Sequence, residues 1–287
     1  MSPSRRAVLV GGLAGLTLAG LGGAETGALP VRGWLSSLGL PGGVPAVKLG
    51  RLVSGNFVSA ARGGARTGWS IGYPPGKHSR LPVLITLHGR GGSHRDSFGG
   101  SLHLDRFLAD AVARGSAPFA IASVDGGAAE YWHPKHATDP ARMVIEEFLP
   151  LLKGRGLATE RLGFLGWSMG GYGALYLAGR LGASRVAVAI AESPAVWHHA
   201  GQSAAGAFDD AEDFDRHSIF GRLSLLDGVA LRLDCGASDG FAPVTRDLRA
   251  ALVPVPAGGI EPGGHDAQYW RSQAAAQLRY AAGHLTA

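Results

Sequence analysis

The stretch Leu162-Gly163-Phe164-Leu165-Gly166-Trp167-Ser168-Met169-Gly170-Gly171 lies near the middle of the 287-residue chain. Apolar residues lead up to Gly166, as in a buried strand, and small residues that suit a helix follow Gly171. Glycine two positions before and two positions after Ser168 fits a strand-to-helix turn that is too sharp for side chains. Such a turn holds the serine hydroxyl above a sheet, with a helix N-terminus beneath it. The stretch predicts an α/β sheet with Ser168 as a candidate nucleophile.

Strand patterns alternate with helix patterns on both sides of this turn. Strands are expected at residues 47–60, 65–73, 81–87, 119–124, 185–191, 229–233 and 253–256. Helices are expected at residues 105–114, 138–151, 244–252 and 266–284, and directly after the turn. The alternation predicts a mostly parallel central sheet with helices on both faces, in one catalytic domain over residues 45–287.

The composition excludes several classes of function. Charged residues make up 17% of the chain and the net charge is +5, without a run of like charges that would suit nucleic acid. The single cysteine, Cys235, excludes an intramolecular disulfide and a cysteine-based metal cage. No glycine-rich loop has the spacing of a nucleotide or dinucleotide site, so no cofactor is expected. His198-His199, and His133 with His136, are not completed by a nearby acid, so no metal site is expected either.

The N-terminus has the features of an export signal. Ser4-Arg5-Arg6 precedes an uncharged run over residues 7–24, which ends in the small residues Gly22-Gly23-Ala24. Paired arginines before such a run favour the twin-arginine route. We therefore expect a signal over residues 1–24 and a linker over residues 25–44, in a protein that is secreted or associated with the cell envelope. An uncleaved membrane anchor is the alternative.

A serine nucleophile needs a base, and the base needs an orienting carboxylate. His265 follows the last expected strand and precedes the closing helix, so it belongs to a loop at the carboxyl edge of the sheet. Asp239 follows the strand at 229–233 and reaches the same edge, with Asp234 as the alternative acid. The order of Ser168, Asp239 and His265 along the chain is the order found in α/β-hydrolases.

Two backbone N–H groups are needed to stabilise the negative charge that forms on an attacked carbonyl oxygen. The N–H of Met169 directly follows the nucleophile. The second donor is expected in the loop His88-Gly89-Arg90-Gly91-Gly92, where glycine allows the backbone to approach a substrate. Arg90 is the first choice and Gly91 the second.

Four ordered motifs, at residues 81–92, 166–171, 236–239 and 264–270, resemble the esterase branch of the α/β-hydrolases. This branch includes S-formylglutathione hydrolases, feruloyl esterases and secreted mycolyltransferases, and the resemblance spans roughly residues 51–285. It implies the α/β-hydrolase fold, the catalytic triad and oxyanion donors named above, and catalysis through an acyl-enzyme. The mycolyltransferases differ in the loop at 88–91 and commonly use glutamate as the acid.

The sequence therefore predicts an exported serine ester hydrolase that acts on a small-molecule or lipid ester. Trp132, Trp197 and the insertion at 192–227 are expected to border the substrate pocket, although packing within the fold is an equal alternative for each. An acyltransferase to an alcohol acceptor is the alternative enzyme. A catalytically silent binding protein on the same fold is the alternative outside enzymes.

Overall fold

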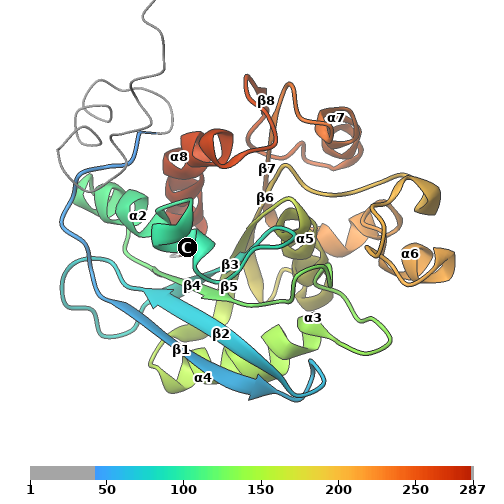
Figure 1. The fold of residues 1–287 in the computed structure, drawn as a ribbon. Coiled ribbons are helices and arrows are strands. Elements are labelled where there is room, and N and C mark those ends of the chain that lie inside the picture. Colours follow the sequence, from blue (N-terminus) through green and yellow to red (C-terminus); the bar gives the residue numbers. More distant parts are fainter. Residues whose placement is uncertain (1–42, 286–287) are drawn as a thin grey trace, which may run out of the picture.

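An eight-stranded sheet forms the centre of the computed structural model, which describes residues 43–285 (Figure 1). The strands lie in the order β1-β2-β4-β3-β5-β6-β7-β8. They are β1 (Leu52–Ser59), β2 (Ala65–Gly72), β3 (Pro82–Leu87), β4 (Ala120–Val124), β5 (Ala158–Trp167), β6 (Val186–Glu192), β7 (Ala230–Gly236) and β8 (Ile260–Glu261). The expected signal at 1–24 and most of the linker at 25–44 lie outside the described residues.

Strand direction decides where functional loops can meet. β1 and β2 form an antiparallel hairpin, and β2 pairs antiparallel with β4. From β4 to β8 every neighbouring pair is parallel. The carboxyl ends of β3, β5, β6 and β7 therefore lie at one edge of the sheet, and the loops that leave them lie close together.

Helices cover both faces of the sheet. The helices are α2 (Leu104–Ala113), α3 (Pro140–Arg142), α4 (Leu149–Gly154), α5 (Met169–Leu181), α6 (Ala211–His217), α7 (Ala242–Ala251) and α8 (Ala267–Leu285), with shorter turns η2 (Asp96–Gly100), η3 (Met143–Phe148), η4 (Ala200–Gln202) and η5 (Phe220–Leu226). α2 and α8 pack side by side on one face (Figure 1). α4, α5 and α7 pack on the other face. The predicted fold class, a mostly parallel sheet covered by helices on both faces, is confirmed.

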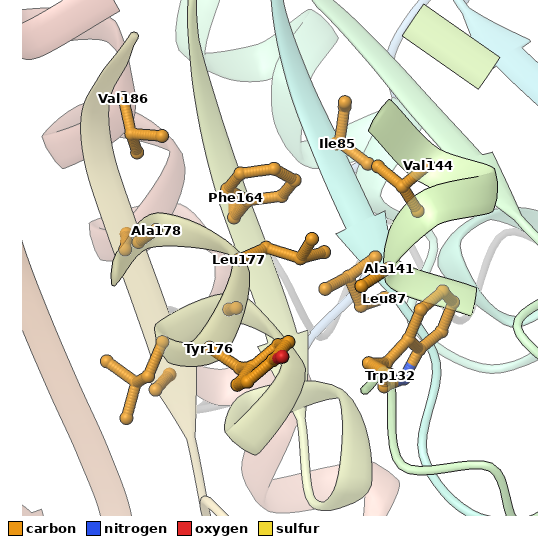
Figure 2. Packing of buried hydrophobic residues seen from close by; sticks show 14 of the residues in the cluster. Ile85, Leu87, Trp132, Ala141, Val144, Phe164, Tyr176, Leu177, Ala178 and Val186 are labelled. Atoms are coloured by element: carbon orange, nitrogen blue, oxygen red, sulfur yellow. The ribbon is translucent and has the colours of Figure 1, made fainter. Parts of the chain in front are cut away.

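The two faces have separate hydrophobic cores because successive side chains of a strand point in opposite directions. On β5, Phe164 joins the core under α5, whereas Leu165 joins the core under α2 and α8. Figure 2 shows the first of these cores, where Ile85, Phe164 and Leu177 pack together between the sheet and α5. Strands that are buried on both faces read as continuous apolar runs, which is why these strands are recognisable in the sequence.

The last strand does not lie where the sequence pattern places it. Residues 253–256, predicted as a strand, are irregular, and the final strand is the later and shorter β8. Pro254 and Pro256 have no N–H for a strand ladder. The guanidinium of Arg249 instead donates to the carbonyl oxygens of Pro256, at 2.9 Å, and Gly258, at 3.0 Å. A half-buried arginine thus provides hydrogen bonds that a neighbouring strand would otherwise provide.

Between β6 and β7 the chain leaves the sheet as an insertion that carries η4, α6 and η5. Figure 1 shows α6 at the margin of the molecule, beyond α5. Over residues 43–285, no helix combines the length and the apolar character needed to cross a membrane.

Candidate active site

Ser168 lies at the turn between β5 and α5, in a strained backbone conformation with φ of 56° and ψ of −120°. A Cβ at Gly166 would collide with the carbonyl oxygen of Gly170, and a Cβ at Gly170 would collide with that of Leu87. Only glycine fits at these two positions. The Ser168 N–H donates to the carbonyl of Glu192 at 2.9 Å, which fixes the turn to the end of β6.

The structure brings the three predicted triad residues together at the carboxyl edge of the sheet. Nε2 of His265 lies 2.9 Å from Oγ of Ser168. Nδ1 of the same ring lies 2.8 Å from Oδ2 of Asp239. Because a carboxylate can only accept, Nδ1 carries the proton and Nε2 is free to accept the hydroxyl proton of the serine. This is the arrangement that a serine nucleophile requires.

The carboxylate of Asp239 is held in one orientation. Its Oδ1 accepts a hydrogen bond from the N–H of Phe241 at 2.9 Å. Burial by itself would raise the pKa of Asp239, but hydrogen bonds from His265, from the Phe241 N–H and from Ser193 outweigh it and leave the pKa below its usual value. Asp239 therefore stays ionised and keeps the His265 proton on Nδ1.

Asp234, the alternative acid, has other partners. It is fully buried, and its carboxylate accepts two hydrogen bonds from Arg232, at 2.7 and 2.9 Å. Gln277 on α8 donates a third bond at 3.0 Å. Asp234 thus forms an ion pair within β7, and its hydrogen bond from Gln277 joins β7 to α8, whereas the contact with His265 is made by Asp239.

The loop that carries Arg90 lies beside Ser168, since a Cβ at Gly89 would lie 3.4 Å from the Cβ of Ser168. The N–H of Met169 belongs to the first turn of α5, where an α-helix offers no internal acceptor. The N–H of Gly91 donates to the carbonyl of Ala128 at 2.8 Å and is therefore occupied. Among the described residues the Arg90 N–H has no such acceptor, so the geometry favours Arg90 over Gly91 as the second donor.

His88 supports this loop, a role that the sequence analysis did not assign. It is fully buried, its Nδ1 lies 2.8 Å from the Gly89 carbonyl, and its Nε2 accepts the Gly126 N–H at 3.0 Å. Burial lowers its pKa, so the ring is neutral. His88 therefore ties the oxyanion loop to the loop after β4. The position of His88 directly before Gly89 is the feature of the sequence that could have indicated this role.

Trp132 does not border an accessible pocket. Its side chain is fully buried, and its Nε1 donates to the His88 carbonyl at 3.3 Å. Figure 2 shows the ring beside Leu87 and Ala141, inside the core. A Cβ at Gly173 on α5 would collide with this ring. The expected pocket role of Trp132 is thus corrected to packing beneath the oxyanion loop.

Trp197 is linked to the triad through the ring of Phe241. It lines a hollow of about 290 Å³ together with Phe241 and Val244. The rings of Trp197 and Phe241 are 5.7 Å apart, and the Phe241 ring is 5.4 Å from that of His265. On its other side, His265 meets the edge of Trp270 at 5.2 Å. Phe241 and Trp270 therefore hold the imidazole in place, a role that was not predicted for either.

A mostly parallel sheet with a strained serine after its central strand, and with an aspartate and a histidine in the later loops, defines the α/β-hydrolase fold. No protein-family model and no curated protein sequence matches this chain.

Solved structures share the fold. A ferulic acid esterase superimposes with a TM-score of 0.71 at 20% identity, over 81% of this chain and 98% of its own. An S-formylglutathione hydrolase from Agrobacterium tumefaciens gives 0.67 at 15% identity, over 83% and 99%. A fluorophosphonate-binding serine hydrolase from Staphylococcus aureus gives 0.66 at 17% identity, over 82% and 99%. The resemblance inferred from the motifs is confirmed at the level of the fold.

Proposed function

We propose that this protein is a serine ester hydrolase. The observation that carries the proposal is the continuous hydrogen-bonded chain from Ser168 through His265 to Asp239, at 2.9 and 2.8 Å. A serine with a purely structural role does not require a strained turn, or a base and an ionised acid hydrogen-bonded one after the other. The similarity of fold to ferulic acid esterases and S-formylglutathione hydrolases supports the same class of reaction.

In the proposed mechanism each triad residue has its own role. Nε2 of His265 takes the hydroxyl proton of Ser168 as Oγ attacks the ester carbonyl carbon. The same imidazolium then gives the proton to the leaving alcohol, and an acyl-serine remains. Water, activated by His265 in the same way, hydrolyses the acyl-serine and restores the serine hydroxyl. Asp239 stabilises the imidazolium in both halves of the reaction.

The N–H groups of Met169 and Arg90 would receive the negative charge of each tetrahedral intermediate. One such donor is worth about 10²–10³ in kcat in serine hydrolases, because the donors are fixed before the charge develops. The Arg90 side chain reaches the insertion, where it donates to the Ala205 carbonyl at 3.3 Å, and this contact helps to fix its backbone.

Hydrolysis is favoured over acyl transfer by solvent access. The His265 side chain is 34% exposed, so water can reach the nitrogen that must activate it. An acyltransferase must instead exclude water while it binds an alcohol. Transfer to an alcohol remains the alternative activity for the same acyl-enzyme.

The candidate site for the acyl group of the ester is the hollow that Phe241 lines, because the Phe241 ring is 5.4 Å from that of His265. Trp197, Phe241 and Val244 give it an apolar wall, and its volume of about 290 Å³ suits a small acyl or aromatic group. We therefore propose a small-molecule ester, or a lipid ester that inserts only the end of its chain.

A fluorophosphonate probe tests the proposal directly, because it reacts with an activated serine. We expect one covalent label for each chain, on Ser168, and hydrolysis of short p-nitrophenyl esters by the unlabelled protein. A folded protein that neither takes up the probe nor hydrolyses these esters would refute the proposal.

We further propose that the protein is exported, on the basis of Arg5-Arg6 and the uncharged run at 7–24. Mass spectrometry of protein from the producing cells should find a mature N-terminus near Glu25. An intact N-terminus on protein that resists carbonate extraction would favour the membrane anchor.

A further inference from the structure

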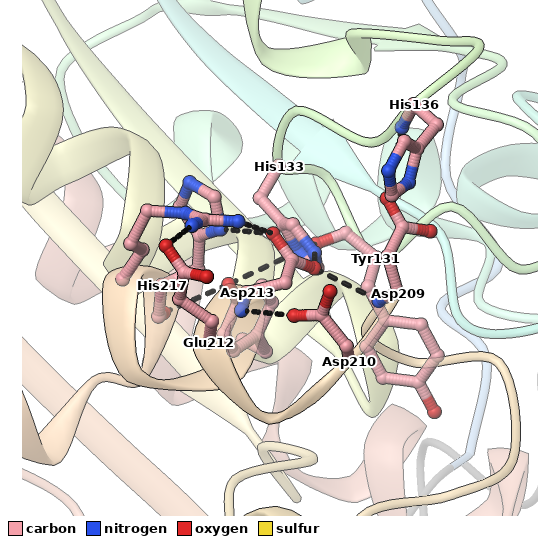
Figure 3. Close-up of polar contacts among 10 residues, drawn as sticks. Tyr131, His133, His136, Asp209, Asp210, Glu212, Asp213 and His217 are labelled. Atoms are coloured by element: carbon pink, nitrogen blue, oxygen red, sulfur yellow. Dashed lines mark hydrogen bonds and ion pairs between the residues drawn. The ribbon is translucent and has the colours of Figure 1, made fainter.

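A second histidine–aspartate cluster lies away from the triad, where the insertion meets the loop between β4 and α3 (Figure 3). His133 belongs to that loop, and Asp213 and His217 are spaced four residues apart on α6. One ligand atom from each of the three side chains lies within 4.8 Å of the others. His133 is 80 positions from Asp213 in the chain, so no spacing in the sequence indicates this group.

The cluster is buried among aromatic rings. The side chains of His133, Asp213 and His217 are 0%, 4% and 13% exposed. Phe208 stacks on one side of His133 at 4.9 Å, and His217 stacks on the other side at the same distance. Tyr176 meets the edge of His217 at 5.6 Å. Water therefore has little room to satisfy polar atoms here.

The protons of the cluster can be assigned from its fixed acceptors. The hydroxyl of Tyr172 donates to the His217 carbonyl at 2.9 Å, and so uses its only proton. Nδ1 of His133 lies 3.1 Å from that hydroxyl oxygen and 3.1 Å from the Tyr131 carbonyl. Since both oxygens can then only accept, Nδ1 of His133 must carry a proton.

This assignment leaves an unmatched contact. Neutral His133 with its proton on Nδ1 has a lone pair on Nε2, and Nε2 faces Oδ2 of Asp213 at 3.3 Å. Two acceptors thus face each other in a dry site and need a cation between them. Arg216, the nearest formal cation to this carboxylate, is 3.7 Å from the other oxygen, Oδ1.

A proton between Nε2 of His133 and Oδ2 of Asp213 is unfavourable. Protonation would place an imidazolium between two stacked rings without solvent. The second carboxylate oxygen, Oδ1, meets Nδ1 of His217 at 2.8 Å.

We propose that His133, Asp213 and His217 bind a transition-metal dication of the Zn²⁺ type. Two imidazoles and one carboxylate are the donors that such ions prefer, whereas Mg²⁺ and Ca²⁺ take oxygen ligands. Ligand atoms around tetrahedral zinc are about 3.3 Å apart, given bonds of about 2.0–2.1 Å, and this matches the 3.3 Å from Nε2 of His133 to Oδ2 of Asp213. Nδ1 of His217 lies closer, 2.8 Å from Oδ1, in a hydrogen bond that binding of the ion would replace.

Contacts around the three residues orient them for such an ion. Metal-binding histidines almost always donate their second ring N–H to a carbonyl or carboxylate, as Nδ1 of His133 does to Tyr131. Asp213 accepts the Asp209 N–H at 2.9 Å. Positive φ angles of 53° at Tyr131 and 57° at Trp132 turn the loop so that His133 points inward.

The ion would connect the insertion to the loop between β4 and α3. That loop also contains Trp132, whose ring lies under the oxyanion loop, and the insertion contains Trp197. The site is structural, since the triad performs the proposed chemistry without it. Its existence does not depend on whether the protein hydrolyses esters.

Calorimetric titration and thermal unfolding of chelator-treated protein test the site with Zn²⁺ and with Mg²⁺. We expect one Zn²⁺ for each chain, and a rise in Tm of about 5 °C or more at 100 times Kd. His217→Asn should weaken Zn²⁺ binding at least about 100-fold, because even the outer contacts of a metal site contribute 10–100-fold. Anomalous diffraction should place the ion between the three side chains.

His198→Asn is the matched control, since His198 pairs with Asp247 on the surface, at 3.0 Å. It should bind Zn²⁺ as the wild type does. His217→Asn is chosen because its side chain is partly exposed, and circular dichroism without metal checks that the variant folds. Equal Zn²⁺ affinity in His217→Asn and the wild type, equal effects of Mg²⁺ and Zn²⁺, or an anomalous peak at His265 alone would overturn the proposal.

Discussion

His265 and His133 each pair with an aspartate, but the two pairs have opposite surroundings. The His265 side chain is 34% exposed and its Nε2 meets the hydroxyl of Ser168. The His133 side chain is 0% exposed and its Nε2 meets a second acceptor, Asp213. The imidazole of His265 therefore faces a proton donor and is accessible to solvent, whereas the imidazole of His133 faces no donor at Nε2 and is closed to solvent.

The difference shows that residue type does not decide between catalysis and structure. A general base must gain and lose a proton in every turnover, so it needs a donor on one side and access to water. His265 has both, together with Asp239 to hold its tautomer. His133 is fixed by the Tyr131 carbonyl and stacked rings, an environment that suits a ligand or a packing contact.

The largest expected effect is that of Ser168→Ala. Removing the nucleophile should lower kcat by about 10⁴ or more, because no other group in the triad can form the acyl-enzyme. Tm should change little, since the serine hydroxyl bonds only His265 among the described side chains. Steady-state kinetics and differential scanning calorimetry measure the two quantities. Undiminished hydrolysis by pure Ser168→Ala protein would show that the triad is not the site.

Asp239→Asn and Asp234→Asn distinguish the catalytic role proposed for Asp239 from the structural role of Asp234. Asp239→Asn should lower kcat by about 10⁴ because the amide favours the wrong tautomer of His265. Asp234→Asn should instead lower the free energy of unfolding by about 3 kcal/mol or more, since it leaves Arg232 without its buried partner. Kinetics and urea denaturation of both variants give the comparison. A folded but inactive Asp234→Asn with an active Asp239→Asn would move the acid role to Asp234.

His133→Asn tests the buried half of the comparison. The variant loses the contacts of Nε2 and the ring stacking, so its free energy of unfolding should fall by about 2–3 kcal/mol. The kcat of the folded variant should stay within about threefold of wild type. Measurement in chelator-treated protein keeps metal binding out of the result. His265→Asn is the matching variant at the triad, and it should lose activity while its stability stays nearly unchanged. If folded His133→Asn lost activity to the same degree, the two histidine–aspartate pairs would not have different roles.

The triad could be predicted from the sequence because its geometry follows from local and topological rules. Glycine spacing around Ser168 reflects collisions within one turn. Asp239 and His265 follow β7 and β8, and parallel strands end at the same edge of a sheet. The hairpin, the buried strands and the helices were likewise recognisable from their periodicity. Catalytic roles for these residues remain predictions until the variants above are measured.

The buried cluster could not be predicted in the same way. His133 and Asp213 are 80 positions apart and meet through an insertion whose path is set by tertiary packing. Trp132 gave no sign of its burial, because an aromatic residue in a loop suits a pocket and a core equally. The misplaced last strand has a similar cause, since the hydrogen bonds of Arg249 to irregular backbone leave no periodic pattern.

A third acid at the same edge, Glu192, shows the effect of burial where it outweighs a neighbouring cation, Arg232. It ends β6, is 1% exposed, and its Oε1 has no hydrogen-bond partner among the described residues. Burial, followed by repulsion from Asp234, raises the pKa of Glu192 well above its ordinary value of 4.5. The side chain is therefore protonated in the folded protein at pH values where the unfolded chain has lost that proton.

Glu192→Gln is expected to change the pH dependence of stability. The contribution of Glu192 is fully present below the unfolded pKa of 4.5 and is lost as the pH rises toward the higher folded pKa. In that window each pH unit removes about 1.4 kcal/mol from the free energy of unfolding. Glutamine cannot ionise, so Glu192→Gln should gain stability relative to wild type as the pH increases from 5 to 8. Urea denaturation across this range measures the slope, with Glu146→Gln as the control because its side chain is 65% exposed. Parallel stability curves for Glu192→Gln and wild type would mean that Glu192 is ionised in the fold, and that burial at this edge does not keep the carboxyl protonated.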